Sequence, residues 1–206
     1  MQNLSFIGME KGLLYETIIT TKNGAEIPNA APIGVTCKNE TEIVLYIFED
    51  TRTLKNIKSD GRFAVNLLKD PLAFALSTVG ELSPDYFKRF NNDFYIKKTD
   101  AFFTAVVTKI REVQKNDNIG KSKLNIITAD VEKIIIKNKN VEPLNRAIYA
   151  VIESLIYLSR IEMVDDKTAA NYLERINEMS RVVSRVGGLE HKKAMAQILK
   201  RLKNNN

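Results

Sequence analysis

The chain has 206 residues, of which 44% are hydrophobic and 27% are charged, the composition of an ordinary water-soluble globular protein. Its 31 basic residues exceed its 25 acidic residues only modestly, and a single cysteine and a single histidine exclude an internal disulfide and a zinc site rich in histidine. No apolar run is long enough to predict a transmembrane helix, and the first residues lack the pattern of a signal peptide. We therefore expect a cytoplasmic protein with no membrane partner and no metal.

From residue 13 to residue 137 the chain has the β-branched, partly alternating pattern of short strands. An Asn-Gly pair at residues 23 and 24 predicts a hairpin after the first strand. Most connections are too short for parallel crossovers, so we expect an antiparallel sheet that closes into a barrel. The last predicted strand is too long to be flat and is expected to bend. The predicted strands are Leu14–Thr20, Ala31–Cys37, Thr41–Phe48, Arg62–Leu68, Ala105–Val113 and Lys123–Ile136.

Two short helices are predicted within this β-rich part. One begins at Thr51 and ends near Gly61. The other begins at Asp70-Pro71, because proline is favoured in the first turn of a helix. A further short turn is predicted at Ser83, in front of several aromatic residues.

After Pro143 the apolar residues recur every three and four positions, which predicts three helices. The first should end near Val164, the second should begin after Asp165, and the third should cover Leu189–Leu202. Gly187 follows the second helix, where we expect a left-handed backbone. We therefore predict two domains, a barrel over residues 1–142 and a helical domain over residues 143–206.

Three features of the β-rich part are candidates for a ligand site. The small residues of Asn29–Val35 would let a planar ligand approach the backbone, although an edge strand explains them too. The hydroxyls and the guanidinium of Thr51–Thr53 lie at a predicted helix start, which suits a phosphate, although a simple helix cap uses the same residues. Asn66 lies in an apolar strand, where a neighbour or a ligand must satisfy its amide.

In this order the three features resemble the FMN-binding split barrel: N-A-A-P-I-G-V at residues 29–35, T-R-T-x-x-N at residues 51–56, and V-N at residues 65–66. More closely, the chain resembles an uncharacterised prokaryotic family, well represented in methanogenic archaea. Its members are FMN-binding, flavin reductase-like split-barrel proteins with a helical C-terminal domain. The N-R-A-I-Y-A-V-I-E-S-L-I segment of Asn145–Ile156 is part of this resemblance.

The resemblance implies a homodimer that holds FMN between the barrels of its two subunits. It places Asn29, Ala30, Ala31 and Pro32 along the isoalloxazine and the ribityl chain of FMN. It assigns the phosphate to Thr51, Arg52 and Thr53, and it brings Asn66 to the flavin or the ribityl chain. The flavin would supply the redox chemistry, so no catalytic side chain is identified.

The function that the resemblance implies is flavin-dependent oxidoreductase activity, like that of a flavin reductase, on a small substrate or electron donor. Two alternatives stay open. One is a non-catalytic FMN carrier or electron-transfer module, and the other is a regulatory protein whose helical domain binds a macromolecule. The basic residues of the last helix suggest nucleic acid, but this helix has no aromatic side chain on which bases could stack, so we expect no such partner.

Three further features are assigned structural roles. We expect Cys37 to be a small buried hydrophobe and His191 to be solvated. The aromatic residues between Tyr86 and Phe103 are expected to pack in the core and at the dimer interface, although a wall that covers the flavin would use the same residues.

Overall fold

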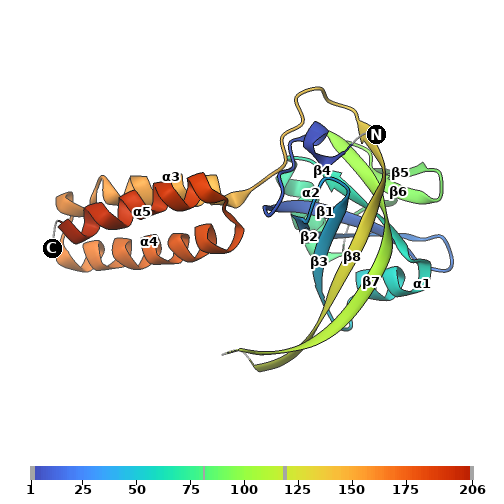
Figure 1. Cartoon of the computed structure of the whole chain (residues 1–206), viewed down its shortest axis with the longest axis horizontal. Coiled ribbons are helices and arrows are strands. Elements are labelled where there is room, and N and C mark those ends of the chain that lie inside the picture. Colours follow the sequence, from blue (N-terminus) through green and yellow to red (C-terminus); the bar gives the residue numbers. More distant parts are fainter. Residues whose placement is uncertain (1–2, 81, 118–119, 205–206) are drawn as a thin grey trace. The chain divides into compact units, whose positions relative to one another are not determined.

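Six strands of the chain close into an antiparallel barrel (Figure 1). The computed structural model describes residues 3–80, 82–117 and 120–204. The strand order around the barrel is β1-β2-β3-β8-β7-β4. The predicted antiparallel barrel is therefore confirmed. Its strands are β1 (Leu14–Lys22), β2 (Pro28–Cys37), β3 (Glu42–Phe48), β4 (Arg62–Leu67), β7 (Ala101–Asp117) and β8 (Gly120–Ile136).

The inside of the barrel is filled by every second residue of its strands. On β3, for example, Ile43, Leu45 and Ile47 are buried, whereas Tyr46 and Phe48 point outward. Each fully buried side chain of this size contributes roughly 1.5–3 kcal/mol to folding. The core therefore fixes which residues of each strand face the surface.

Shorter elements complete this part of the chain. They are η1 (Leu4–Ile7), α1 (Arg52–Asp60), α2 (Pro71–Val79), η2 (Pro84–Tyr86), β5 (Phe87–Phe90) and β6 (Asp93–Ile96). Both predicted helices are present, and Thr51 and Asp70 cap them with their side chains.

The β5–β6 hairpin was not predicted, because two strands of four residues are too short to show a pattern. It packs through aromatic rings. Tyr95 stacks on Phe102 with ring centroids 4.1 Å apart, and Phe90 meets Phe102 edge-on at 5.3 Å. Phe102 and Phe103 are buried as predicted, whereas Phe90 and Tyr95 are only half-buried.

The long strand β8 bends in Figure 1, as predicted from its length. Thr104 of β7 pairs with Lys133 and Ala105 pairs with Val131, so Glu132 is an extra residue in β8. Such a bulge bends the strand and re-aims a side chain.

Glu132 is one of two carboxylates that hold the guanidinium of Arg62. Arg62 Nη1 lies 3.2 Å from Glu132 Oε1, and Arg62 Nη2 lies 3.0 Å from Oδ2 of Asp93, whose side chain is only 4% exposed. The hydrogen bonds from Arg62 lower the pKa of Glu132, so this carboxylate stays ionised. The cluster ties β4, β6 and β8 together.

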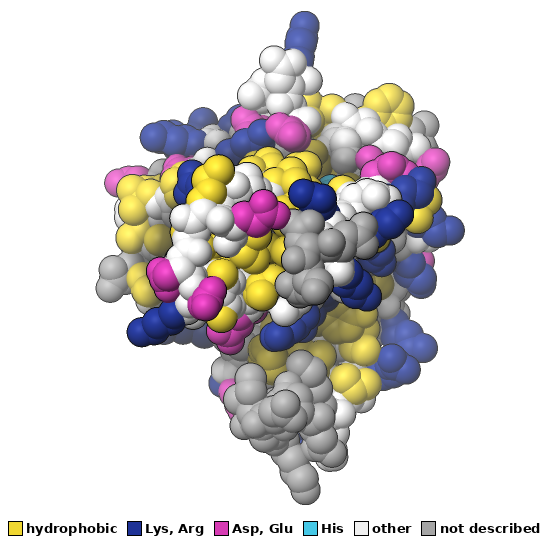
Figure 2. Space-filling view, turned by 90° about the vertical axis from the view of Figure 1, so that its left-hand side faces the viewer, with side chains coloured by type: hydrophobic (Ala, Val, Ile, Leu, Met, Phe, Trp, Pro, Cys, Tyr) yellow, Lys and Arg dark blue, Asp and Glu magenta, His cyan; other side chains and the backbone are white. Residues whose placement is uncertain are grey.

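The chain divides into two compact units, Met1–Leu144 and Asn145–Asn206, each described here by itself. The second unit contains α3 (Arg146–Leu158), η3 (Ile161–Met163), α4 (Asp166–Val186) and α5 (Leu189–Asn204). The first predicted helix therefore ends earlier than Val164, because a short 3-10 turn replaces its last part. Figure 2, which looks onto this unit, shows hydrophobic side chains gathered among charged ones.

Gly187 differs from its prediction. Its φ of −87° and ψ of 147° are extended, not left-handed. A Cβ atom at this position would lie 2.6 Å from the carbonyl oxygen of Val183 and 3.1 Å from Cβ of Ala147. Only glycine therefore fits at this position, because any side chain would collide with α4 and with Ala147 of α3. Within the described residues, no helix is both long and apolar enough to cross a membrane.

Replacing Arg62 with Met should lower the free energy of unfolding by about 1–3 kcal/mol, because Asp93 would stay buried without its cation. Urea denaturation measures this change. As a control, Lys193→Met removes an exposed ion pair with Glu190 (2.8 Å) and should cost less than about 1 kcal/mol. An Arg62→Met protein as stable as this control would contradict the structural role of the cluster.

Candidate functional site

Strands β2 and β3 pair at one end only. Val35, Thr36 and Cys37 of β2 pair with Leu45, Val44 and Ile43 of β3. Over residues 28–34, β2 keeps its pairing with β1, but no pairing with β3 is present in this fully described stretch. The two strands therefore leave a gap in the barrel wall.

The edge of β2 that faces this gap has few donors. In an antiparallel pair, residues alternate between those whose N–H and C=O groups face the partner strand and those whose groups face away. Cys37 N donates to Leu13 O (3.0 Å) and Asn23 N donates to Ile27 O (3.1 Å), so the odd-numbered residues of β2 face β1. The backbone groups of Ala30, Pro32 and Gly34 consequently face the gap. Because Pro32 has no N–H group, this edge presents mainly carbonyl oxygens.

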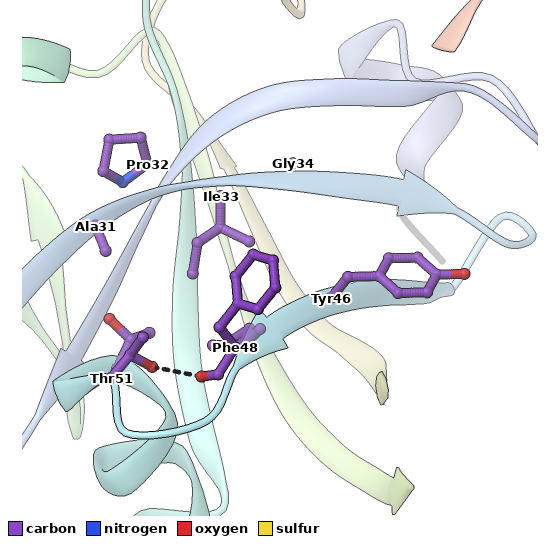
Figure 3. Close-up of a pocket in the computed structure, with 9 residues that line it drawn as sticks. Ala31, Pro32, Ile33, Gly34, Tyr46, Phe48 and Thr51 are labelled. Atoms are coloured by element: carbon purple, nitrogen blue, oxygen red, sulfur yellow. Dashed lines mark hydrogen bonds between the residues drawn. The ribbon is translucent and has the colours of Figure 1, made fainter. Parts of the chain in front are cut away.

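A cavity of about 290 Å³, here called the gap cavity, occupies this opening (Figure 3). In Figure 3 the ring of Phe48 points toward Ile33 across the gap. Phe48 and Tyr46 are 54% and 49% exposed, which is unusual for aromatic side chains on a sheet face. The lining is therefore mostly apolar. The residues that line the gap cavity are Ala31, Pro32, Ile33, Gly34, Tyr46, Ile47, Phe48, Thr51 and Thr53.

The first turn of α1 adds polar groups to this cavity. Thr51 Oγ1 accepts a hydrogen bond from Leu54 N (3.2 Å) and donates one to Phe48 O (3.3 Å; dashed in Figure 3). The next two amides, those of Arg52 and Thr53, have no hydrogen-bond partner within the described part of the chain. Unpaired amides at a helix N-terminus bind anions, and Thr51 and Thr53 bring this end of α1 to the cavity.

Glu49 holds the loop between β3 and α1 in place. Its N–H group donates to Lys123 O (3.0 Å), and its carboxylate accepts hydrogen bonds from Asn125 Nδ2 (2.5 Å) and Lys58 Nζ (3.2 Å). The bonds from Asn125 and Lys58 lower the pKa of Glu49. The carboxylate thus anchors the start of α1 while it stays charged.

A second cavity of about 200 Å³ lies between α1 and the β1–β2 hairpin and is here called the hairpin cavity. Asn29 Nδ2 donates to Thr53 Oγ1 (3.1 Å), and these two partners line different cavities. Arg52 lines the hairpin cavity, whereas its neighbours Thr51 and Thr53 line the gap cavity. The residues that line the hairpin cavity are Asn23, Ile27, Pro28, Asn29, Arg52, Lys55 and Asn56.

The structure brings together six of the eight predicted site residues around the start of α1. They are Asn29, Ala31, Pro32, Thr51, Arg52 and Thr53. Ala30 lines neither cavity, and it packs with Ile18, Leu68 and Ala73 in a separate apolar cluster. Ala30 is buried in this cluster, whereas its neighbour Ala31 lines the gap cavity.

Asn66 also lies apart from both cavities. It is fully buried, and its Nδ2 donates to Ile18 O (2.9 Å) and Thr20 Oγ1 (3.1 Å). Its Oδ1 accepts from Ile96 N (2.7 Å). The amide is therefore satisfied by β1 and β6, and we do not include Asn66 in the candidate site.

The sequence analysis missed Tyr46, Phe48 and Lys55. The alternation along β3 would have placed both aromatic rings on the outer face, but nothing in the sequence shows that a gap lies beside them. Lys55 lines the hairpin cavity because it lies one helical turn after Thr51.

Cys37 and His191 both have structural roles. Cys37 is buried, and burial raises the pKa of its thiol, which therefore stays protonated. His191 Nδ1 accepts a hydrogen bond from Gly188 N (3.2 Å) at the start of α5.

Known proteins resemble the chain over nearly its whole length. Residues 15–138 match the sequence model of "Protein of unknown function (DUF447) N-terminal domain", and residues 145–200 match that of "Protein of unknown function (DUF447)". The uncharacterized protein MJ1453 of Methanocaldococcus jannaschii is 27% identical over 195 residues, which is 92% of this chain and 97% of that protein.

Two solved structures are similar. The crystal structure of the FMN-bound protein MM1853 from Methanosarcina mazei, assigned to the same family, is 29% identical with a TM-score of 0.53. The match covers 96% of this chain and 98% of that one. The styrene monooxygenase flavin reductase of Pseudomonas putida S12 is 15% identical with a TM-score of 0.50, over 63% of this chain and 83% of that one. This second likeness concerns the barrel fold alone.

We expect Asn66→Ala to lower the free energy of unfolding by at least about 2 kcal/mol, because it leaves buried partners on β1 and β6 unsatisfied. Asn29→Ala removes a single bond to Thr53 and should cost about 1 kcal/mol or less. Urea denaturation compares the two variants. An Asn66→Ala protein as stable as the wild type would refute the structural role of this amide.

Proposed function

The chain belongs to the DUF447 family, and we propose that it binds FMN in the gap cavity and uses it for redox chemistry. The observation that supports this most is the position of the open edge of β2 beside the unpaired amides of α1. The FMN-bound relative from Methanosarcina mazei supports the choice of cofactor.

The residues of the gap cavity fit the two ends of FMN. The apolar wall at Ala31, Pro32 and Phe48 suits the planar isoalloxazine ring. The carbonyl oxygens of the open edge suit its polar N–H group, since these oxygens have no strand partner on that side. The amides of Arg52 and Thr53 suit the phosphate.

Side chains at the start of α1 would add to the phosphate site. The Thr51 and Thr53 hydroxyls line the cavity, and the exposed guanidinium of Arg52 lies between them in sequence. A charge-assisted hydrogen bond from Arg52 would favour the charged phosphate of FMN. Among the described residues, none of those that line the gap cavity is cationic, so Arg52, the neighbour of Thr51 and Thr53, would supply the positive charge for a single phosphate.

We further propose that the chain forms a homodimer through the outer face of β3 and β8. Tyr46 pairs with Ile126 and Phe48 pairs with Leu124 across these strands, and both aromatic rings are about half exposed. An exposed apolar face of this kind is typical of an interface. Because Tyr46 and Phe48 also line the gap cavity, a second subunit on this face would cover the bound cofactor.

The proposed activity is flavin-dependent oxidation or reduction of a small substrate or electron donor. When bound, FMN supplies the hydride and electron chemistry. The residues of the chain bind the phosphate and orient the ring against the edge of β2. The ring of Phe48 limits the access of water to the flavin. An FMN carrier without turnover would share the same cavity, and a reductant assay with bound FMN separates the two functions.

Ala31→Leu should weaken FMN binding by at least about tenfold, because the larger side chain would fill the cavity that receives the ring. The measurement is a titration of the apoprotein with FMN, followed by flavin fluorescence. Ala31→Ser is the matched control, since it keeps the residue small and should bind FMN like the wild type. Normal FMN binding by a folded Ala31→Leu protein would rule out the gap cavity as the flavin site.

Ile126→Lys should convert the proposed dimer into a monomer, because it places a charge on the apolar face of β8. Sedimentation velocity measures the mass. Phe6→Lys serves as the control, because Phe6 is 61% exposed on η1 and lies outside this face. A wild-type monomer, or a dimer that survives Ile126→Lys, would contradict the proposed interface.

A further inference from the structure

One face of helix α3 is both apolar and exposed. Ile148, Ile152 and Leu155 are 45%, 45% and 48% exposed, and Tyr149 beside them is 54% exposed. Their spacing of three and four residues places these side chains on one side of the helix. The opposite side of α3 is buried within the helical unit. The four exposed residues are here called the α3 stripe.

The α3 stripe has no counterpart on the other two long helices of this unit. Arg146 and Glu153 are the only charged residues among the 13 of α3, whereas the exposed residues of α4 and α5 are mostly charged. Within the described residues of α4 and α5, Leu189 is the only large hydrophobic side chain that is exposed. A helix that is apolar on nearly all sides is normally buried on all of them. The α3 stripe therefore has the composition of a surface that a partner covers.

We propose that the α3 stripe packs antiparallel against the α3 stripe of a second copy of this chain. This inference rests on the homodimer of the proposed function. Each helical unit is joined to its barrel at Leu144 and Asn145. A dimer held through the barrels therefore raises the local concentration of one α3 around the other. By symmetry, the second copy presents the same apolar stripe.

The charges of α3 indicate the antiparallel direction. Arg146 and Glu153 are both exposed and lie seven residues, or about two turns, apart, so they share one flank of the stripe. A two-fold axis perpendicular to the helices brings this flank against the same flank of the second copy. In one register each Glu153 then faces Arg146 of the second copy, and the pair occurs twice. Parallel helices would instead bring the charged flank against the apolar flank of Ile148 and Leu155.

The size of the α3 stripe indicates how much it contributes to a dimer. One face of this helix of 13 residues measures roughly 20 Å by 10 Å. Each partner in a stable interface buries roughly 800 Å², which is several times this area. Pairing of α3 therefore strengthens a dimer that the barrels form, but it does not hold two copies together by itself.

The dissociation constant of the dimer tests the inference, measured on the full chain by sedimentation velocity over a dilution series. Ile152→Lys should raise this Kd by about tenfold or more, because it places a charge in the middle of the apolar contact. Leu189→Lys is the matched control, because Leu189 is an exposed apolar residue on α5, outside the stripe. It should change the Kd by less than about twofold.

Charge reversal tests the antiparallel direction. Glu153→Arg and Arg146→Glu should each raise the Kd by about threefold or more, because each variant places like charges opposite one another. The double variant with both substitutions should return the Kd to within about twofold of the wild type, because opposite charges face one another again. A double variant that dimerises more weakly than either single variant would refute the antiparallel pair.

A monomeric background separates dimerisation from folding. In the Ile126→Lys protein, which we expect to be monomeric, adding Ile152→Lys should leave the midpoint of urea denaturation unchanged. A lower midpoint would show that the stripe packs within a single copy, and it would overturn the inference.

The same measurements distinguish failure of the inference from failure of the proposed function. If the wild type is a dimer that Ile126→Lys dissociates, but Ile152→Lys and Leu189→Lys behave alike, only the α3 contact is wrong. If the wild type is a monomer, the proposed dimer and the α3 contact both fail, while FMN binding is tested by the titration of the Ala31 variants. If the dimer survives Ile126→Lys but not Ile152→Lys, the α3 contact stands and the barrel interface is wrong.

Discussion

A barrel of six strands closes only where each strand pairs on both sides, and β2 meets this condition over only part of its length. Its last three residues join β3, while Pro28 to Gly34 pair with β1 alone. The candidate site depends on this interruption. The gap exposes one edge of β2, gives the rings of β3 a cavity to line, and leaves room for the start of α1. The Glu49 anchor then fixes the position of the helix N-terminus relative to that edge.

Much of this architecture could be predicted from the sequence. Alternation in segments such as Thr41–Phe48 identified the barrel strands, and Thr51 and Asp70 marked helix starts through their capping chemistry. The site was predicted only in part, because short motifs do not show which face a residue takes. Ala30 and Ala31 look equivalent in sequence but lie on opposite faces of β2. Asn66 resembles a ligand residue in the sequence, but Ile96 of the β5–β6 hairpin donates a hydrogen bond to its side-chain oxygen. The strands of that hairpin are too short to predict from the sequence.

The short helix α1 links the two parts of the site. At its start Thr51 and Thr53 line the gap cavity, whereas Arg52, Lys55 and Asn56 line the hairpin cavity. A helix presents different residues on different sides with fixed spacing, so one turn can supply two neighbouring sites with distinct chemistry. The sequence shows the residues of this turn but not the division between them. The hydrogen bond from Asn29 to Thr53 connects the walls of the two cavities.

The two prolines of β2 have a consequence for how the gap is kept open. An unpaired strand edge is a template on which another chain can add a strand, which leads to aggregation or domain swapping. Such addition needs alternating donors and acceptors, and Pro28 and Pro32 remove two of the donors that would face the gap. Along this edge an incoming strand would find only the N–H groups of Ala30 and Gly34 beside the carbonyl oxygens. The same residues that open the wall to a small ligand thus protect the protein from polymerising through it.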